Sequence, residues 1–232
     1  MCYNLIMAQF RKHPLINNQY YHVFSRSIGK FVVFNNTHEF QRFLKLLDFF
    51  RFENFNYKYS EFNELGAMKQ IKILDSLYQD PNVLVEIVAF CLMPTHFHLI
   101  LKQKNTNGIS SYISRVLNGY ARYFNVKHRR TGPLWAGRFK DVLVNNDKQM
   151  LHLTRYVHLN PISANLVKNP EEWQFSSCKL YISSEDSDNY FCVFREIISR
   201  KPKEYEKFIN DRKSYQRELS EIKNLMIDNC TG

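Results

Sequence analysis

The chain has 232 residues, 44% of them apolar, which is enough for one domain with a hydrophobic core and a further segment. Its net charge of +10 favours a polyanionic partner such as nucleic acid. The five cysteines are irregularly spaced and form no C-x-x-C motif, which argues against disulfides and a zinc site. Without a signal-peptide pattern or an apolar run long enough to cross a bilayer, we expect a cytoplasmic protein that does not contact a membrane.

The first third of the chain predicts a strand followed by helices. Residues 19–27 are typical of a strand, and a turn at 27–30 leads into a short extended piece. Thr37 is the expected cap of a helix that reaches about residue 54. The polar stretch 55–83 contains a second predicted helix at 67–77.

A hairpin is predicted next, from two apolar runs at 84–93 and 96–102 that flank Pro94 and Thr95. Side chains alternate along a strand, so His96 and His98 point to one side while Phe97 points to the other, into a core. Two neighbouring imidazoles can bind one metal ion if a third ligand arrives from elsewhere. A His-x-His pair also occurs often without a metal.

The following segment is strongly basic. A helix is predicted at about 109–126, then a basic loop at 128–133 and a last strand at 137–144. Residues 105–165 contain nine Lys or Arg against two Asp, a net +7 of the total +10, which favours a nucleic-acid track over a merely solvated face. Trp135, in a loop bounded by Gly and Pro, is either a core anchor or a stacking platform, and we favour the former.

Another helix is predicted between Asp147, its expected cap, and Pro161, its expected end. Tyr156 and Asn160 lie four residues apart on it, so they share a face. The Asn160 amide could complete the two-histidine site, and a phenol beside a metal-bound phosphate is a nucleophile for phosphodiester cleavage. His158 points elsewhere and is interpreted as structural or facing DNA.

Five motifs in order resemble those of the HUH single-strand transposases with one catalytic tyrosine, in particular their REP-associated branch. They are YHVFSR (21–26), MPTHFHL (93–99), TGPLWAGRFK (131–140), RYVHLNP (155–161) and WQFSS (173–177). Two departures are Thr95, where Asn is usual, and Ser163-Ala-Asn165, which replaces Arg-Ala-Gly. Asn165 tolerates the left-handed conformation that Gly would supply.

The resemblance implies that Tyr156 is the nucleophile, and that His96, His98 and Asn160 hold Mg²⁺ or Mn²⁺. It implies cleavage and rejoining of single-stranded DNA beside a hairpin through a 5′-phosphotyrosine, with no nucleotide cofactor. As phosphate contacts we expect the basic residues Arg122, Arg129, Arg130, Arg138, Lys140 and Arg155.

The predicted order βαββαβ indicates an α+β fold with a ferredoxin-like palm, a four-stranded antiparallel sheet, followed by the Tyr156 helix. We place the catalytic domain at 1–181 and a helical C-terminal extension at 182–232, with helices at 191–198 and 204–225. The protein is expected to be a monomer or homodimer.

Three alternative functions compete with that of a transposase. A single-strand RNA-binding palm would require an RNP1-like run, which the sequence lacks. A two-histidine phosphoesterase would require a second His-x-Thr/Ser motif. A domesticated transposase that binds its hairpin without moving DNA is compatible with every residue above.

Overall fold

The computed structural model describes residues 14–53, 58–79, 82–183 and 191–211. Its centre is a four-stranded antiparallel sheet of β1 (Tyr20–Arg26), β2 (Val85–Met93), β3 (His96–Gln103) and β4 (Lys140–Leu143). The strand order is β2-β3-β1-β4. Together with the helices between the strands, this confirms the predicted α+β fold with its ferredoxin-like palm.

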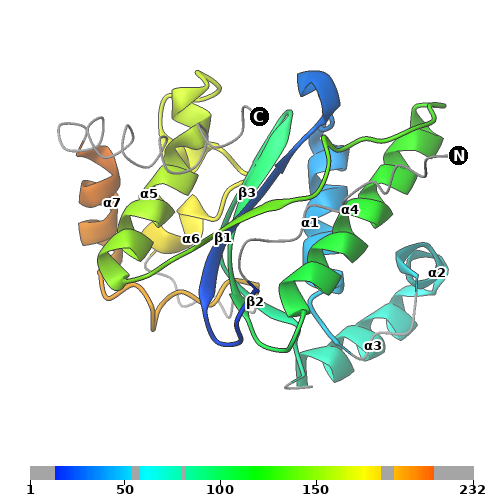
Figure 1. The fold of residues 1–232 in the computed structure, drawn as a ribbon, viewed down its shortest axis with the longest axis horizontal. Coiled ribbons are helices and arrows are strands. Elements are labelled where there is room, and N and C mark those ends of the chain that lie inside the picture. The colour runs from blue at the N-terminus through cyan, green and yellow to red at the C-terminus, as the bar shows by residue number, and fades with distance from the viewer. Residues whose placement is uncertain (1–13, 54–57, 80–81, 184–190, 212–232) are drawn as a thin grey trace, which may run out of the picture.

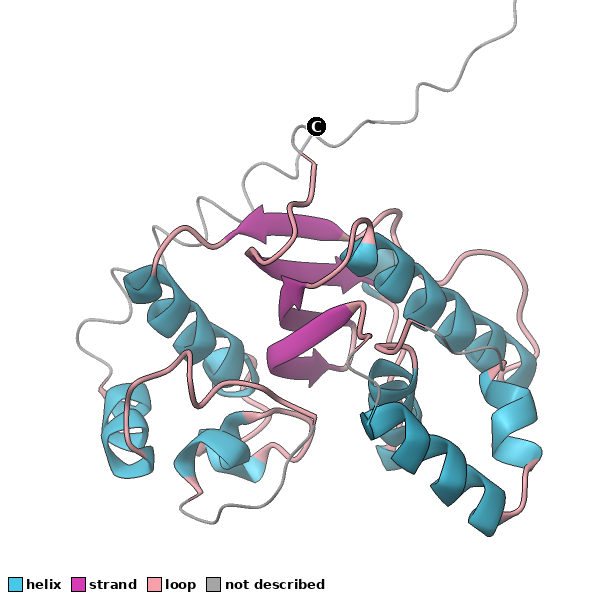
Figure 2. Ribbon diagram, turned by 90° about the horizontal axis from the view of Figure 1, so that it is seen from below, coloured by secondary structure: helices cyan, strands magenta, loops and turns pink. Residues whose placement is uncertain are grey.

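Helices cover both faces of the sheet (Figures 1 and 2). One face carries α1 (Thr37–Phe49) and α4 (Gly108–Lys127), with the short α2 (Tyr59–Glu64) and α3 (Ala67–Gln79) at their lower end in Figure 1. The other carries α5 (Asp147–Ser163), α6 (Cys178–Ile182) and α7 (Pro202–Asn210). Short 3-10 turns lie at Ile28–Lys30 and Pro170–Glu172. No helix in the described ranges has the length and apolarity needed to cross a bilayer.

An aromatic core on the α4 side fixes the orientation of the hairpin. Phe97 of β3 packs against Phe43 of α1, with ring centroids 5.2 Å apart, and against Trp135 at 5.7 Å. Trp135 is buried and its indole N–H donates to the Leu117 carbonyl, so it is a core anchor. Because Phe97 is held inside, His96 and His98 must face the opposite side, towards α5.

Several predicted boundaries were wrong at the ends of elements. Asn36 and Asn146, not Thr37 and Asp147, are the N-caps of α1 and α5, and each accepts a hydrogen bond from the backbone three residues on. The first helix ends at Phe49, before 54, and β4 is shorter than 137–144. Pro161 lies inside α5, which continues to Ser163 although proline has no N–H to donate to the Val157 carbonyl.

The described part of the C-terminal extension packs on the α5 side. Residues 191–198 form turns instead of the predicted helix, and the Val193 N–H donates to the Ile87 carbonyl at 2.8 Å. The helix predicted at 204–225 is α7 within the described residues, and positions beyond 211 lie outside them. The Tyr205 hydroxyl lies 2.9 Å from His158 Nδ1, so α7 is anchored to the inner side of α5.

A buried carboxylate joins α1 to the end of α4. Glu39 is fully buried and accepts hydrogen bonds from Lys127, from His128 and from the backbone and side chain of Asn35. Burial alone would raise the pKa of this carboxyl, but the hydrogen bonds outweigh burial and lower the pKa from 4.5 to about 2. A carboxyl with a depressed folded-state pKa contributes stability above its unfolded pKa and loses it as the pH falls towards 2.

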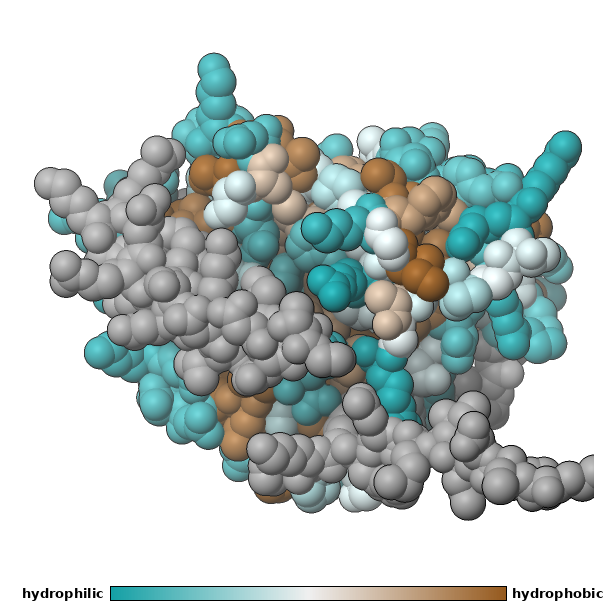
Figure 3. Space-filling view, turned by 45° about the horizontal axis from the view of Figure 1, so that its top comes forward, coloured by the Kyte–Doolittle hydropathy of each residue, from teal (hydrophilic) through white to brown (hydrophobic). Residues whose placement is uncertain are grey.

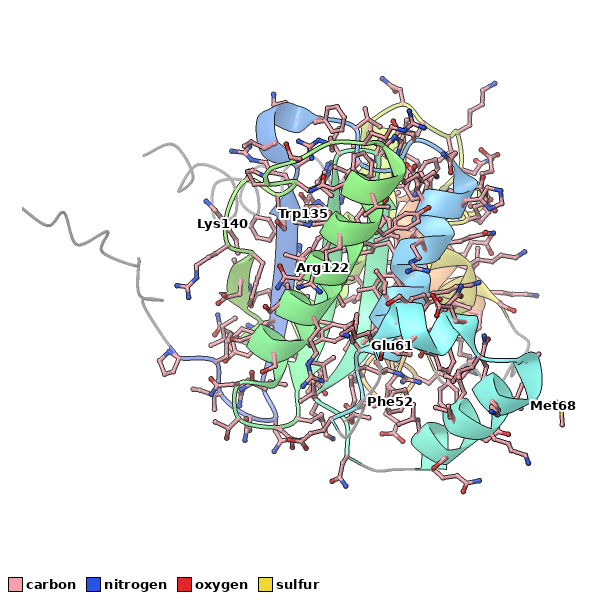
Figure 4. All side chains as sticks on the ribbon, turned by 90° about the vertical axis from the view of Figure 1, so that its right-hand side faces the viewer. Phe52, Glu61, Met68, Arg122, Trp135 and Lys140 are labelled. Carbon is pink, nitrogen blue, oxygen red and sulfur yellow. The ribbon has the colours of Figure 1, made fainter. Side chains whose placement is uncertain are left out.

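We therefore expect Glu39→Gln to lower the free energy of unfolding at pH 7 by about 3 kcal/mol, with a smaller difference from wild type at pH 3. Urea unfolding at pH 7, 4.5 and 3 measures this difference. Glu61→Gln on α2 (Figure 4), which removes an exposed pair with Lys58, is the matched control and should have little effect. An equal loss for Glu39→Gln at every pH would contradict the assigned ionisation.

Candidate active site on the α5 face of the sheet

The strand register gathers polar side chains on the α5 face. Directly paired residues in neighbouring strands point to the same side. His96 pairs with Arg26, and His98 pairs with Phe24, which in turn pairs with Lys140. His22 lies two residues before Phe24 on β1 and therefore shares this face.

His96 and His98 lie next to each other, as strand alternation requires. Their ring centroids are 5.1 Å apart and the rings are perpendicular. His98 is buried, whereas His96 is partly exposed at the beginning of β3. Burial lowers the pKa of His96 to about 4, with a further contribution from the Arg26 charge, and it lowers the pKa of His98 as well. Both imidazoles are therefore neutral at pH 7.

Helix α5 places Tyr156 against the histidines. The Tyr156 ring meets His98 edge-on, with centroids 5.4 Å apart, and its side chain is 6% exposed. Asn160 follows one turn later, and its amide Nδ2 donates to the Tyr156 carbonyl at 2.8 Å. Burial raises the pKa of the Tyr156 phenol, and a hydrogen bond with the Asn160 side chain opposes this only in part. The phenol is consequently protonated at neutral pH.

His22 is a member of this cluster that the sequence interpretation missed. Its Nε2 lies 3.0 Å from His98 Nδ1, and its ring meets Tyr156 at 6.1 Å between centroids. His22 is buried, which lowers its pKa to about 3, and its Nδ1 has no hydrogen-bond partner within the described chain. Alternation along β1 puts His22 and Arg26 on one face, but only the pairing of β1 with β3 shows that this face is the His98 face.

The residues present fit a divalent cation. Thr95 Oγ1 lies 3.0 Å from His96 Nδ1, and His22 Nε2 lies 3.0 Å from His98 Nδ1. The Nε2 atoms of His96 and His98 are therefore left for a further partner. One ring nitrogen held by a hydrogen bond and the other turned to the ion is the usual arrangement of a ligating histidine. Within the described residues no third His, Cys, Asp or Glu completes a cluster. Further ligands would therefore be neutral protein groups or atoms of the substrate. The Asn160 amide oxygen is one such neutral group.

Two cations stand beside the histidines on the same face. Arg26 is exposed and lies opposite His96 in the register, and Lys140 is exposed in the His98 row. Lys140 was predicted as a phosphate contact, whereas Arg26 was not. Its place at the end of β1 next to His96 makes it a further candidate for binding a phosphate there.

The other predicted DNA contacts are spread over the molecule. Arg129 and Arg138 are exposed in the loop between α4 and β4, and Arg130 is partly exposed there. Arg122 is exposed on α4 (Figure 4), on the opposite side of the sheet from Tyr156. The structure therefore brings Lys140 to the histidines but not Arg122.

Arg155 was wrongly predicted to contact DNA. Its side chain is 1% exposed, and its guanidinium donates to the Phe208 carbonyl of α7 and lies 4.1 Å above the Phe208 ring. It points away from solvent and joins α5 to α7. His158, three residues on, is also structural: it is buried and hydrogen-bonded to Tyr205 and Ser177.

One family model matches part of the chain. Residues 55–160 match the family described as "Transposase IS200 like". The matched segment contains His96, His98 and Tyr156 and ends at Asn160, while His22 and Arg26 precede it.

Two curated relatives are REP-associated tyrosine transposases by name. The one from Haemophilus influenzae is 27% identical over 111 residues, covering 43% of this chain and 62% of the relative. The one from Escherichia coli K12 is 26% identical over 93 residues, covering 40% of this chain and 53% of the relative. The matches thus span less than two thirds of each relative.

A solved structure of a REP-associated tyrosine transposase bound to a REP hairpin has the same fold. Its TM-score with this chain is 0.53 at 17% identity, over 77% of this chain and 87% of the other. The match of residues 55–160 and the curated relatives are similarities in sequence, and the solved structure adds a similarity in fold. Over residues 55–160 this chain is similar to the IS200-like transposases, and its fold is that of the solved REP-associated tyrosine transposase.

Proposed function

We propose that this protein is a metal-dependent single-stranded DNA transposase that cleaves and rejoins DNA beside a hairpin. The observation that carries the proposal is the position of Tyr156, edge-on to His98, with Asn160 one turn later on the same helix. The match to the IS200-like family supports it. The hairpin as partner is inferred from the solved relative, which is bound to a REP hairpin.

In the proposed reaction the Tyr156 oxygen attacks the phosphorus of a backbone phosphate and the phenol gives up its proton. The bond from phosphorus to the 3′ oxygen breaks, which leaves a 5′-phosphotyrosine and a free 3′-hydroxyl. Such a hydroxyl can attack the phosphotyrosine in reverse, which rejoins strands and regenerates the phenol. No external energy source is needed, because the covalent link conserves the phosphodiester bond energy.

The side chains around Tyr156 have different proposed roles. His96, His98 and Asn160 would hold Mg²⁺ or Mn²⁺, which when bound polarises the phosphate and lowers the pKa of a nearby phenol. Arg26 and Lys140 would neutralise the charge of the phosphate backbone beside it. Because Tyr156 is buried, its hydroxyl must become accessible when DNA binds; catalytic contacts often tighten only in the substrate complex.

Incubation with single-stranded hairpin oligonucleotides and Mn²⁺ tests the proposal. A covalent protein–DNA band on a denaturing gel is the expected result, and it should need both a hairpin with a single-stranded flank and the metal. Absence of the band over a hairpin library would contradict cleavage, even if binding persisted.

Binding itself should depend strongly on salt, because Lys and Arg release counterions when they contact phosphates. We expect Arg129→Ala combined with Arg130→Ala to weaken binding to all hairpins alike and to reduce the slope of log K against log salt by about 1 to 2. Fluorescence anisotropy across a salt titration measures the slope. Lys72→Ala, which removes an exposed cation from α3, is the control and should leave the slope unchanged. A double variant with the wild-type slope would show that this loop does not contact DNA.

A further inference from the structure

An exposed apolar surface with an arginine beside it lies at the His96 end of the sheet. We propose that this surface, made by Ile28, Phe31, Val32 and Arg130 and here called the Phe31 platform, stacks an unpaired base next to the reacting phosphate. The inference rests on the proposed function and adds a base-binding site to it.

Phe31 is unusual in its exposure. Its side chain is 47% exposed, and within the described ranges it is the phenylalanine that lies most in solvent. Its neighbours Ile28 and Val32 are 43% and 41% exposed. Folding normally buries a phenylalanine, so three exposed apolar residues within five positions of the chain mark a candidate binding surface.

The Phe31 ring is nevertheless held in place. It lies perpendicular to the Phe124 ring of α4, with centroids 5.9 Å apart, and about half of its surface remains in solvent. The Arg130 guanidinium lies over the ring, 5.4 Å from its centroid, and is itself fixed by hydrogen bonds that it donates to the Asn125 side chain and the Pro133 carbonyl. A fixed ring beside a fixed guanidinium suits the stacking of a nucleic-acid base, since every base has a flat π face.

The platform is joined directly to the hairpin that carries the histidines. The Ser27 N–H donates to the Thr95 carbonyl at 2.8 Å, and the Val33 N–H donates to the Pro94 carbonyl at 2.9 Å. Thr95 in turn contacts His96. The platform therefore lies at the end of the sheet where β3 begins with His96, although its ring packs on the α4 side, and we infer that a strand bound at His96 passes over this end.

The charge around the platform selects its occupant. Stretches 26–34 and 128–138 contain Arg26, Lys30, Arg129, Arg130 and Arg138 and no Asp or Glu. Hydrogen bonds from Ile28 N–H to the Leu134 carbonyl and from Ala136 N–H to the Arg26 carbonyl hold the two stretches together. The segment after β1 forms the upper end of the molecule in Figure 1, and Figure 3, with this end turned forward, shows apolar side chains bordered by hydrophilic ones. An apolar surface within two basic segments suits a base with its phosphates better than an apolar protein.

The test uses the full chain and hairpin oligonucleotides in which 2-aminopurine replaces each flanking base in turn. Stacking quenches the fluorescence of this base, so wild type should quench at one flanking position. Phe31→Leu keeps an apolar residue but loses the aromatic face, so the quenching should disappear and binding should weaken about fivefold or more. Phe31→Trp should restore both, and the salt slope should be unchanged in Phe31→Leu because no charge is lost.

Val126→Ala is the matched control, because Val126 is an apolar residue on α4 that is 80% exposed and lies outside the platform. Circular dichroism and thermal unfolding check that Phe31→Leu folds. Wild-type quenching and affinity in Phe31→Leu would overturn the platform while leaving DNA cleavage by Tyr156 intact. A change of oligomeric state in Phe31→Leu with unchanged quenching would also overturn the proposal, because the surface would then be an interface between protein chains. Failure of wild type to bind any hairpin would remove both the platform and the proposed function.

Discussion

The Tyr156→Phe protein is expected to bind hairpin DNA within about twofold of wild type and to form no covalent protein–DNA band. The substitution removes one hydroxyl, whose side-chain hydrogen bond is with Asn160, so the fold should lose only about 1 kcal/mol of stability. The basic residues around the site are untouched, which is why binding persists. Denaturing gels for cleavage and anisotropy for binding separate the two effects.

Tyr123→Phe is the matched control for this substitution. Tyr123 also lies on a helix and is partly exposed, but α4 is on the other face of the sheet from the histidines. It should cleave as wild type does. Cleavage that survives in Tyr156→Phe, or that disappears in Tyr123→Phe, would contradict the assignment of the nucleophile.

His96→Ala and His98→Ala are expected to abolish cleavage by a different route, the loss of metal. Each removes an imidazole that is neutral at pH 7, and Mn²⁺ affinity measured by electron paramagnetic resonance should fall with activity. Cleavage by His96→Ala should recover in part at high Mn²⁺, whereas Tyr156→Phe should not respond. His22→Ala, which removes only the partner of His98 Nδ1, should weaken Mn²⁺ binding about 10- to 100-fold.

His38→Ala serves as the control for the histidine variants, because His38 is exposed on α1 and remote from the α5 face. It should bind Mn²⁺ and cleave as wild type does. Wild-type Mn²⁺ affinity in both His96→Ala and His98→Ala would show that the two imidazoles do not hold the ion.

Local periodicity predicted the part of the site that lies within single elements. Alternation along one strand put His96 and His98 on a common face, and helical spacing put Asn160 one turn after Tyr156. Both relations depend only on the geometry of one strand or one helix, and the aromatic residue between the histidines indicated which face was the core.

Long-range packing decided the remainder, and the sequence carried no signal for it. His22 and Arg26 join the site through the pairing of β1 with β3, at positions 70 or more residues apart in the chain. Arg155 looked like a DNA contact because its neighbourhood is basic, yet its partner Phe208 lies 53 residues later in a segment with no motif. Pro161 looked like a helix end, but the last turn of α5 tolerates it.

The central claim is a covalent bond between Tyr156 and DNA. Peptide mapping of the protein–DNA adduct tests this claim most directly. Wild-type protein is incubated with a reactive hairpin oligonucleotide and Mn²⁺, digested with nuclease and trypsin, and analysed by mass spectrometry. Cleavage after Arg155 and Lys168 releases the peptide 156–168, while Tyr120 and Tyr123 fall into the separate peptides 116–122 and 123–127. We predict the nucleotide mass on Tyr156 in the first of these peptides. A nucleotide on Tyr120 or Tyr123, or cleaved DNA with no modified tyrosine, would contradict the account.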